Sequence, residues 1–405
     1  MTYLTKLTEA HGEIMPRHRR AAKQSNASFK HESAFEGKVR DLTSDGRGVV
    51  SHPDGRTFFV PGVWIDEVAE IRVVGRQGKV GLGQVITLTK ADLQRREAPC
   101  QHHGYSADHC GGCPWMFMPY QVQSAAKLRR LKSTLEDLDD GTAQVDGLLA
   151  APKELGYRNR AQLKTDGSKL GYVAAGTRTL VDVTACPILS ARNGESLASL
   201  RQALPNPNWR GRKQDWQTID LDDNLEEPSL NKRLPFRQGN TQQNAVMREW
   251  LAQAIASMPP DAPVLELFAG SGNFTEVLAS HFKTVVAVEG DQQALQQLSD
   301  VAPERVQAHA LNLFSVPAVE AWVNEKRGIR VLVLDPPREG LKVRTPFLKE
   351  LAELETVIYV ACDLATWARD CKDFLAQGFR LAQVTPLDLF PQTPHLEVLS
   401  VLTRV

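Results

Sequence analysis

From Gln238 onward the sequence alternates short apolar, β-branched runs with stretches that have helical character, and this alternation limits the fold more than any other feature. Strands that alternate with helices favour a doubly wound, mostly parallel sheet of the Rossmann-like type. Ligands of such sheets bind beyond the carboxyl ends of the strands, so the residues there indicate function. The runs are "APVLELF", "TVVAVEG", "IRVLVLD" and "TVIYVAC", followed by a hairpin-like pair that ends in "LEVLSVLTRV".

The first strand end, "VLELFAGSGNFT", is a glycine-rich turn. Gly270 and Gly272 allow a tight turn and a close approach of the backbone to a ligand at a helix N-terminus. Thr275 replaces the third glycine of the dinucleotide fingerprint. Glu289 follows the next strand, where an acid could bind a ribose diol. These residues predict a nucleoside site but do not distinguish NAD from S-adenosylmethionine (SAM).

The fourth strand ends in Asp335-Pro336-Pro337-Arg338. Two prolines after a strand make a stiff loop, which suits a site that must hold a planar base at a fixed distance. A nicotinamide enzyme has no clear use for such a loop. Methyltransferases that act on amino groups of adenine or guanine carry a similar motif, but an aromatic residue follows it there, and here Arg338 follows. The loop therefore favours base modification of another kind.

Cys362 stands where the next strand opens into a polar loop. An unreactive thiol would more naturally lie inside the strand, so this position predicts a nucleophile. The ionisable group available as a general base is Glu397, at the start of the last apolar strand. Cys371 falls within the following helix and is predicted to be structural.

The region from Phe35 to Leu88 contains five short β-rich runs, and Asp54-Gly55 between two of them is a hairpin signal. This pattern predicts a small, OB-like barrel. The pieces "FEGKVRDLTSDGRGV" and "FFVPGVWIDEVAEIRV" resemble the TRAM domain, a small RNA-binding barrel found on RNA-modifying enzymes.

The cysteine spacing predicts a metal centre. No secretory signal and no apolar run long enough to span a bilayer is recognisable, which predicts a cytoplasmic protein without membrane contact. In a reducing compartment, clustered cysteines favour metal binding or catalysis over disulfides. Cys100, Cys110 and Cys113 form C-x9-C-x2-C, and Cys186 lies in "TACPIL". Four thiolates suit either zinc or an iron–sulfur cluster, and free thiols remain a third possibility.

Four motifs in this order, "LFAGSGNF", "LDPPREG", "YVACDLATWARD" and "FPQTPHLE", resemble the RNA uracil-C5 methyltransferase family. The resemblance implies SAM-dependent methylation through a covalent bond between Cys362 and carbon 6 of the base, with Glu397 removing the proton from carbon 5. It implies a [4Fe–4S] cluster, with zinc as the alternative, on Cys100, Cys110, Cys113 and Cys186. The expected SAM-site residues are Gln238, Phe268, Gly270, Glu289, Asn312 and Asp335.

The sequence departs from the family pattern at three points. Asp363-Leu364 stands where Asn-Pro is usual, Pro394 stands where Gly is common, and the gap between Cys100 and Cys110 is longer than is typical. These departures put loop geometry and the role of Cys100 in question more than the reaction itself.

The resemblance also predicts domains and substrate. The tRNA branch of the family is understood to lack the barrel and the cysteine cluster, so a chain with both is expected to act on 23S rRNA. The alternatives are a tRNA substrate and a non-catalytic RNA-binding protein on the same fold. Lys+Arg and Asp+Glu number 48 each, so net charge decides nothing about RNA. A monomer is expected, with a flexible basic tail (1–33), a TRAM-like barrel (34–90), a central α+β domain with the cluster (91–235) and a methyltransferase domain (236–405).

Overall fold

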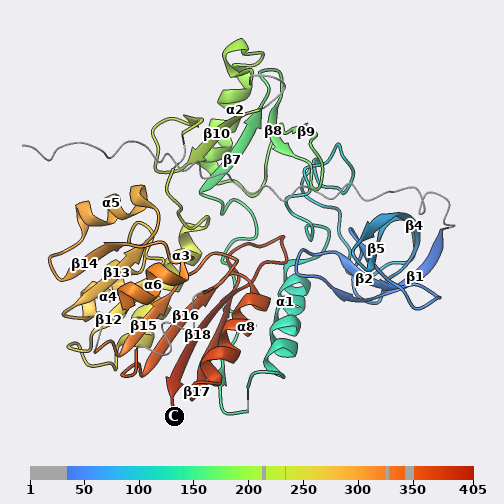
Figure 1. The fold of residues 1–405 in the computed structure, drawn as a ribbon. Helices are drawn as coiled ribbons and strands as arrows, with labels where there is room; N and C mark the ends of the chain where they lie inside the picture. The colour runs from blue at the N-terminus through green and yellow to red at the C-terminus, as the bar shows by residue number, and fades with distance from the viewer. Residues whose placement is uncertain (1–33, 140, 212–215, 233, 324–327, 343–350) are drawn as a thin grey trace, which may run out of the picture.

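The computed structural model describes residues 34–139, 141–211, 216–232, 234–323, 328–342 and 351–405, and these form a barrel, a central sheet and a large α/β unit (Figure 1). The predicted basic tail lies outside the described residues. No helix in the described part of the chain is long and apolar enough to cross a membrane.

The first region is a closed barrel of five strands in the order β1-β2-β3-β5-β4, as the strand pattern predicted. Val39, Phe58 and Ile71 are fully buried in its core. The hairpin expected at Asp54-Gly55 joins β2 and β3, where Gly55 has a positive φ. The strands are β1 (Phe35–Leu42), β2 (Gly48–Ser51), β3 (Thr57–Val60), β4 (Val68–Gln77) and β5 (Val80–Lys90).

The central region is an antiparallel sheet in the order β11-β10-β7-β8-β9. The Pro, Asn and charged residues of segment 203–235 are typical of a linker or an irregular boundary, but β10 and β11 lie within it, and β10 pairs with β7 along six residues. The elements are β7 (Arg160–Thr165), β8 (Leu170–Val173), β9 (Leu180–Asp182), α2 (Ala191–Gln202), a short 3₁₀ turn (Pro207–Trp209), β10 (Gln217–Asp222) and β11 (Ser229–Leu230).

The third region is an eight-stranded sheet in the order β14-β13-β12-β15-β16-β18-β17-β6. Strands β12 to β16 are mutually parallel, and β18 runs antiparallel to both β16 and β17, so the predicted parallel sheet and final hairpin are confirmed. The strands are β6 (Gln144–Val145), β12 (Val264–Leu267), β13 (Val285–Glu289), β14 (Val306–Ala310), β15 (Val331–Leu334), β16 (Thr356–Ala361), β17 (Phe379–Leu387) and β18 (Glu397–Arg404).

Helices cover both faces of this sheet because alternate strand residues point to opposite sides. One face packs against α1, α6 and α8, and the other packs against α3 and α4, with α5 over β13 (Figure 1). The helices are α1 (Tyr120–Leu135), α3 (Thr241–Ile255), α4 (Thr275–His281), α5 (Gln292–Val301), α6 (Val316–Val323) and α8 (Leu364–Leu375).

Helix α1 and strand β6 come from the range assigned to the central domain, yet they complete the C-terminal sheet. Leu131 and Leu135 of α1 share a core with Trp367 and Phe374 of α8. Strand β6 pairs with β17 at the sheet edge. The C-terminal α/β unit therefore has an N-terminal supporting piece, whereas the domain ranges given above stay predictions.

Candidate active site

The glycine-rich turn after β12 is shaped by backbone that few residues adopt. Gly270 and Gly272 have φ of 56° and 99°, and Phe268 before them has φ of 63°, a left-handed conformation that is uncommon for a bulky residue. Such strained backbone clusters at functional sites. A Cβ on Gly272 would lie 2.7 Å from the Leu298 side chain, so the turn also requires a residue without a side chain there.

Glu289, at the end of β13, ties two strand ends together. Its Oε2 accepts the Gly270 N–H at 2.8 Å, and its Oε1 accepts the N–H groups of Gly290 and Asp291 at 2.7 Å each. Three backbone donors therefore fix the carboxylate at the carboxyl edge of the sheet, beside the glycine turn. This is the position where the sequence predicted an acid for a ribose.

Thr275 explains the missing third glycine. Its hydroxyl donates to Oε2 of Glu266 at 2.6 Å, and Glu266 is buried inside β12. Burial raises the pKa of Glu266 to about 8. Sequence analysis missed this pair, although a lone acid within an apolar strand was its visible signal.

The loop after β15 is held by α8. Asp370 Oδ2 accepts the Leu341 N–H at 2.8 Å and the Tyr359 hydroxyl at 2.7 Å, and Arg369 donates to the Glu339 carbonyl oxygen at 2.8 Å. The Asp-Pro-Pro-Arg segment is thereby fixed at its far end. No role was predicted for Asp370, because a local motif does not reveal a partner 29 residues away.

The strand register places Cys362 opposite Glu397. Ala361 at the end of β16 pairs with Val398 of β18, so Cys362, which follows β16, is brought next to Glu397, the first residue of β18, and the charge of Glu397 acts on the Cys362 thiol. Glu397 is buried and Cys362 is half-buried. The two residues predicted to carry the chemistry are thus brought together from positions 35 residues apart in the sequence.

Asp335 completes an acidic cluster with this pair. Burial, with Asp335 adding to it, raises the pKa of Glu397 to about 8. Burial raises the pKa of Asp335 to about 7. Burial, followed by the charges of Glu397 and Asp335, raises the pKa of the Cys362 thiol to about 12. Asp335 thus disfavours ionisation of Glu397, and both carboxylates disfavour ionisation of Cys362, so an incoming cation would be stabilised here.

Arg338 is a cation whose charge acts on both Cys362 and Glu397, and Lys127 also acts on Glu397. The charge of Arg338 lowers the pKa of both Cys362 and Glu397 against the dominant effect of burial. Its guanidinium also donates to Nε2 of His395 at 3.0 Å. Burial, and then Arg338, lowers the pKa of His395 to about 4, so this ring is neutral at pH 7 and accepts the hydrogen bond. Sequence analysis did not identify His395, although it lies within "FPQTPHLE".

The other residues predicted for the nucleoside site are Gln238, Phe268 and Asn312, which lie at the same edge of the sheet and make different contacts. Gln238 donates from Nε2 to Asp335 Oδ2 at 3.5 Å, a long hydrogen bond. The Phe268 ring lies 5.9 Å from the ring of Phe314, which is 43% exposed. Asn312 is exposed, and its side-chain oxygen accepts the Phe314 N–H at 3.0 Å, so it caps the turn after β14.

Two departures from the family pattern keep the local geometry. Asp363 is the N-cap of α8, where its Oδ1 accepts the Ala365 and Thr366 N–H groups, and Leu364 occupies the first helical position. Asn and Asp are equivalent N-caps, and proline is favoured at the position after the cap without being required. In the loop between β17 and β18 the left-handed residue is Gln392, with φ of 69°, so position 394 needs no glycine.

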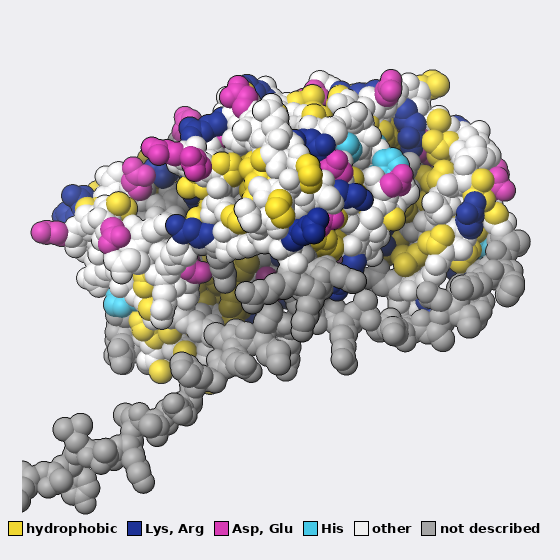
Figure 2. All heavy atoms as spheres, turned by 90° about the horizontal axis from the view of Figure 1, so that it is seen from above, with side chains coloured by type: hydrophobic (Ala, Val, Ile, Leu, Met, Phe, Trp, Pro, Cys, Tyr) yellow, Lys and Arg dark blue, Asp and Glu magenta, His cyan; other side chains and the backbone are white. Residues whose placement is uncertain are grey.

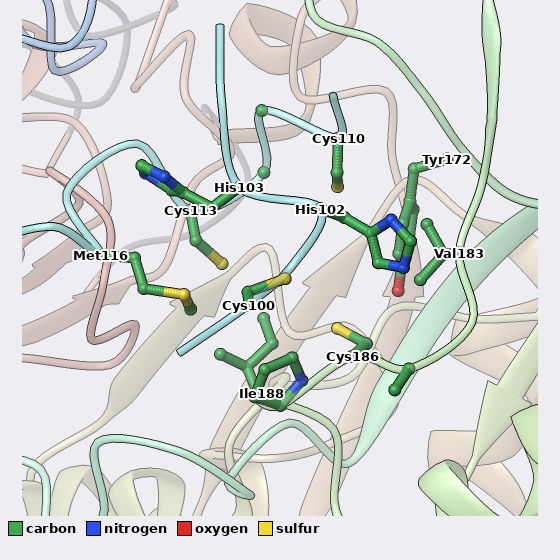
Figure 3. A pocket seen from close by; sticks show the side chains of 14 residues that line it. Cys100, His102, His103, Cys110, Cys113, Met116, Tyr172, Val183, Cys186 and Ile188 are labelled. Atoms are coloured by element: carbon green, nitrogen blue, oxygen red, sulfur yellow. The ribbon is translucent and has the colours of Figure 1, made fainter. Parts of the chain in front are cut away.

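The four clustered cysteines line one small hollow of about 30 Å³, and Figure 3 shows their sulfur atoms pointing into it. Cys186 comes from the segment after β9, and the Tyr172 side chain lines the same hollow. Burial raises the pKa of Cys110 to about 11 and also raises that of Cys113 and Cys186. No group of three or more His, Cys, Asp or Glu side chains among the described residues is arranged as a site for a metal ion. Cys371, by contrast, is fully buried in α8, as expected of a structural thiol.

The strand order, with the reversed strand β18 inserted between β16 and β17, and the polar residues at the strand ends define a class I methyltransferase unit. The tRNA (uracil-5-)-methyltransferase family matches residues 229–405.

Two relatives match most of the chain. An RNA methyltransferase of Nitrosomonas europaea, described as uncharacterized, is 38% identical and is matched over 90% of this chain and 95% of its own. The 23S rRNA (uracil(1939)-C(5))-methyltransferase RlmD of Pseudomonas fluorescens is 31% identical over 89% of this chain and 90% of its own. The chain belongs to the RNA uracil-C5 methyltransferase family and is an enzyme of that class.

The fold also matches a solved structure. The Pyrococcus abyssi tRNA (uracil-54, C5)-methyltransferase, solved with S-adenosyl-L-homocysteine, superposes with a TM-score of 0.66 and 19% identity over 91% of this chain and 99% of its own. That match is too extensive for the β1–β5 barrel to lie outside it. The expectation that a chain with both the barrel and the cysteine cluster acts on 23S rRNA stays a prediction.

Proposed function

We propose that this enzyme transfers a methyl group from SAM to carbon 5 of a uridine in 23S rRNA, with Cys362 as nucleophile and Glu397 as general base. The single observation that carries the proposal is the register that sets Cys362 opposite Glu397, beside Asp335 and Arg338. Addition to carbon 6 and proton removal from carbon 5 take place on one pyrimidine ring, so the nucleophile and the base must both face that ring.

The reaction proceeds in two stages. In the first, the Cys362 sulfur forms a bond to carbon 6, the ring electrons move to give an enolate, and carbon 5 takes the methyl group from the sulfonium of SAM. In the second, Glu397 accepts the proton from carbon 5, the carbon 5–carbon 6 double bond forms again, and the Cys362 thiolate leaves. SAM supplies the electrophilic methyl group, and the chain supplies the nucleophile, the base and their alignment.

The charges around the pair support these roles. A thiol with a raised pKa needs a nearby cation to react as the thiolate, and Arg338 is placed to provide one. The sulfonium of bound SAM would add a second positive charge near Asp335 and Glu397, which favours the carboxylate form that acts as base. We assign the SAM site to the carboxyl ends of β12, β15 and the strands beside them, where the order of the strands in the sheet reverses direction. Its residues are Gln238, Phe268, Gly270, Glu289, Asn312 and Asp335.

The substrate assignment rests on the RlmD relatives. They are named for uracil 1939 of 23S rRNA, and the one described above spans 89% of this chain. The single-stranded target would be bound with its base flipped out of the strand and placed beside Cys362. The TRAM-like barrel is proposed as an additional RNA-binding surface. Figure 2 shows Lys and Arg side chains across the middle of one face, although the net charge is zero. We propose a monomer that acts in the cytoplasm.

The methyl acceptor can be identified directly. We expect a deletion strain to lose 5-methyluridine at one position of 23S rRNA and to regain it when the intact gene is supplied. Mapping of 5-methyluridine in total RNA from the deletion strain, its parent and the complemented strain is the measurement. Loss confined to tRNA would replace the substrate but keep the chemistry. Labelled methyl groups on an exocyclic nitrogen, with none on carbon 5, would refute the proposed reaction.

We propose that Cys100, Cys110, Cys113 and Cys186 hold a [4Fe–4S] cluster. Two observations support the proposal: four cysteine sulfur atoms, the donors that iron–sulfur clusters use, line one hollow, and buried thiols of raised pKa ionise most readily when a cationic centre compensates their charge. A single zinc ion would require all four sulfurs about 2.3 Å from one point. The cluster would link the segment after β5 to the segment after β9 and needs no redox role in the methyl transfer.

Iron analysis tests this centre. We expect anaerobically purified protein to absorb broadly near ~400 nm and to contain about four iron and four sulfide ions per chain. Cys113→Ser should lose most of the iron and melt at a lower temperature, whereas the matched control Cys371→Ser should keep its iron. Stoichiometric zinc without iron would establish the alternative, and equal iron in both variants would remove Cys113 from the ligand set.

A further inference from the structure

One face of α1 carries three polar side chains that all bind the segment leading into Glu397. Gln123, Lys127 and Arg130 are spaced at i, i+4 and i+7, so they share one side of the helix. Their common partner is the connection between β17 and β18, residues 388–396, hereafter the base loop. None of the four motifs contains these three residues, and the mechanism above does not use them.

Lys127 anchors the start of the base loop. Its Nζ donates to Asp388 Oδ1 at 2.7 Å and to the Phe390 carbonyl oxygen at 3.2 Å, and the side chains of Lys127 and Asp388 are both fully buried. An ion pair removed from water is a poor source of stability but fixes geometry strongly, because neither charge tolerates loss of the other.

Gln123 anchors the middle of the base loop. Its Nε2 donates to Gln392 Oε1 at 2.9 Å, and its Oε1 accepts the Gln392 backbone N–H at 2.8 Å. Gln392 has the left-handed backbone described above, a conformation that persists only where the surroundings enforce it. The same Gln123 amide donates to the Trp115 and Met118 carbonyl oxygens, and the Trp115 N–H donates to the Gln392 carbonyl oxygen at 3.1 Å.

Arg130 anchors the end of the base loop. Its guanidinium donates to the Pro394 carbonyl oxygen at 3.0 Å, three residues before Glu397 and one before His395. Each third of the base loop is therefore bound by one residue of a helix that lies more than 250 residues earlier in the chain.

We infer that Gln123, Lys127 and Arg130 of α1 are positioning residues for the general base, which hold the base loop so that Glu397 lies against the target carbon. This inference rests on the proposed function, because it assigns the three residues to the proton-removal stage. They do not touch the reacting atoms and act through the base loop, and the charge of Lys127 also lowers the pKa of Glu397 against the effect of burial.

The inference predicts a fault in one stage of the reaction. Methyl transfer needs Cys362 and SAM, which α1 does not bind, whereas release of the product needs a correctly placed Glu397. We expect Gln123→Leu to lower kcat about 10²-fold, as a displacement near 1 Å does. The KM for SAM should change less than twofold, and methylated enzyme–RNA adduct that survives denaturation should accumulate on ordinary RNA.

Matched controls separate this role from general folding. Gln121→Leu makes the same change on the exposed side of α1 and should leave kcat and the adduct level unchanged. Arg130→Met, at a less buried site, provides a second test if Gln123→Leu fails to fold, and Lys132→Met on the exposed side is its control. Quenched time courses with labelled SAM measure kcat and adduct together, and thermal melting measures folding.

The outcomes separate the inference from the proposed function. Adduct accumulation with lowered kcat in folded Gln123→Leu or Arg130→Met supports the inference. Normal kcat in both variants, or lowered kcat with no adduct and weaker SAM binding, overturns it. Wild-type enzyme is tested in parallel on RNA with 5-fluorouridine at the target, where it should form the adduct through Cys362. If wild type forms none, the proposed function itself fails and the inference with it.

Discussion

Cys362→Ala is expected to abolish methylation, with a loss of turnover on the order of 10⁴-fold or more, because no other group can form the bond to carbon 6. Cys362 is half-buried at the end of β16, so the substitution should leave the fold and SAM binding intact. Single-turnover assays with labelled SAM measure the loss. A gel of denatured enzyme with 5-fluorouridine RNA measures the adduct, which should vanish together with turnover.

Cys371→Ala is the control for this experiment. Its thiol lies fully buried in the same segment of chain, nine residues further on, and takes no part in the proposed chemistry. Removing a buried sulfur costs stability through a small cavity but should leave the adduct. Turnover by Cys362→Ala at more than about one hundredth of the wild-type rate would eliminate the covalent mechanism.

Glu397→Gln is expected to permit one methyl transfer and then to stop. Glutamine matches the size of glutamate, so the start of β18 should keep its pairing, but it cannot accept the carbon 5 proton. Multiple-turnover rate should fall by about 10³-fold, and the methylated adduct should accumulate to roughly one equivalent of enzyme. Its amount on ordinary RNA, set against labelled methyl incorporation, is the measurement.

The pH dependence of the wild-type enzyme bears on the same residue. With a pKa near 8 in the free protein, Glu397 is mostly protonated at pH 7, and a protonated carboxyl cannot act as a base. The fraction of ionised Glu397 therefore increases as pH rises through 8.

The control for Glu397→Gln is Asp300→Asn, which removes the carboxylate of an exposed residue on α5 and should leave turnover unchanged. Rapid normal turnover by Glu397→Gln would assign proton removal to another group, and Asp335, whose charge raises the pKa of Glu397, would be the next candidate.

Much of the site could be predicted because parallel strands bring their carboxyl ends to one edge. Once "VLELFAGSGNFT", "LDPPREG" and "YVACDLA" were recognised as strand ends, their residues had to lie together, whatever the details of the loops. The pairing of Cys362 with Glu397 needed one further element, the antiparallel return of β18 beside β16. The hairpin-like pair had been recognised, but the strand it pairs with had not.

The features that escaped prediction are those whose partners lie far apart in the sequence. Lys127 reads as an ordinary basic residue on an amphipathic helix until its partner Asp388, 261 residues later, is known. In the sequence, Thr275 only interrupts a glycine pattern, whereas in the structure its hydroxyl donates a hydrogen bond to Glu266. His395 and Arg338 belong to separate motifs, each plausible alone, and only their contact reveals a neutral ring that binds a guanidinium. A local pattern contains no information about such pairs.

The support that α1 and β6 give to the C-terminal sheet has a consequence for how the protein is made. A ribosome that adds ~5–20 residues per second makes Lys127 about 13–52 s before Asp388. During that time the apolar side of α1 and the Lys127 side chain lack the partners that bury them in the folded protein. Strand β6 likewise precedes β17, its partner at the sheet edge. The base loop can bind Gln123, Lys127 and Arg130 only after both pieces have been made. The segment that leads into Glu397 therefore depends on contacts with a helix made more than 250 residues earlier in the chain.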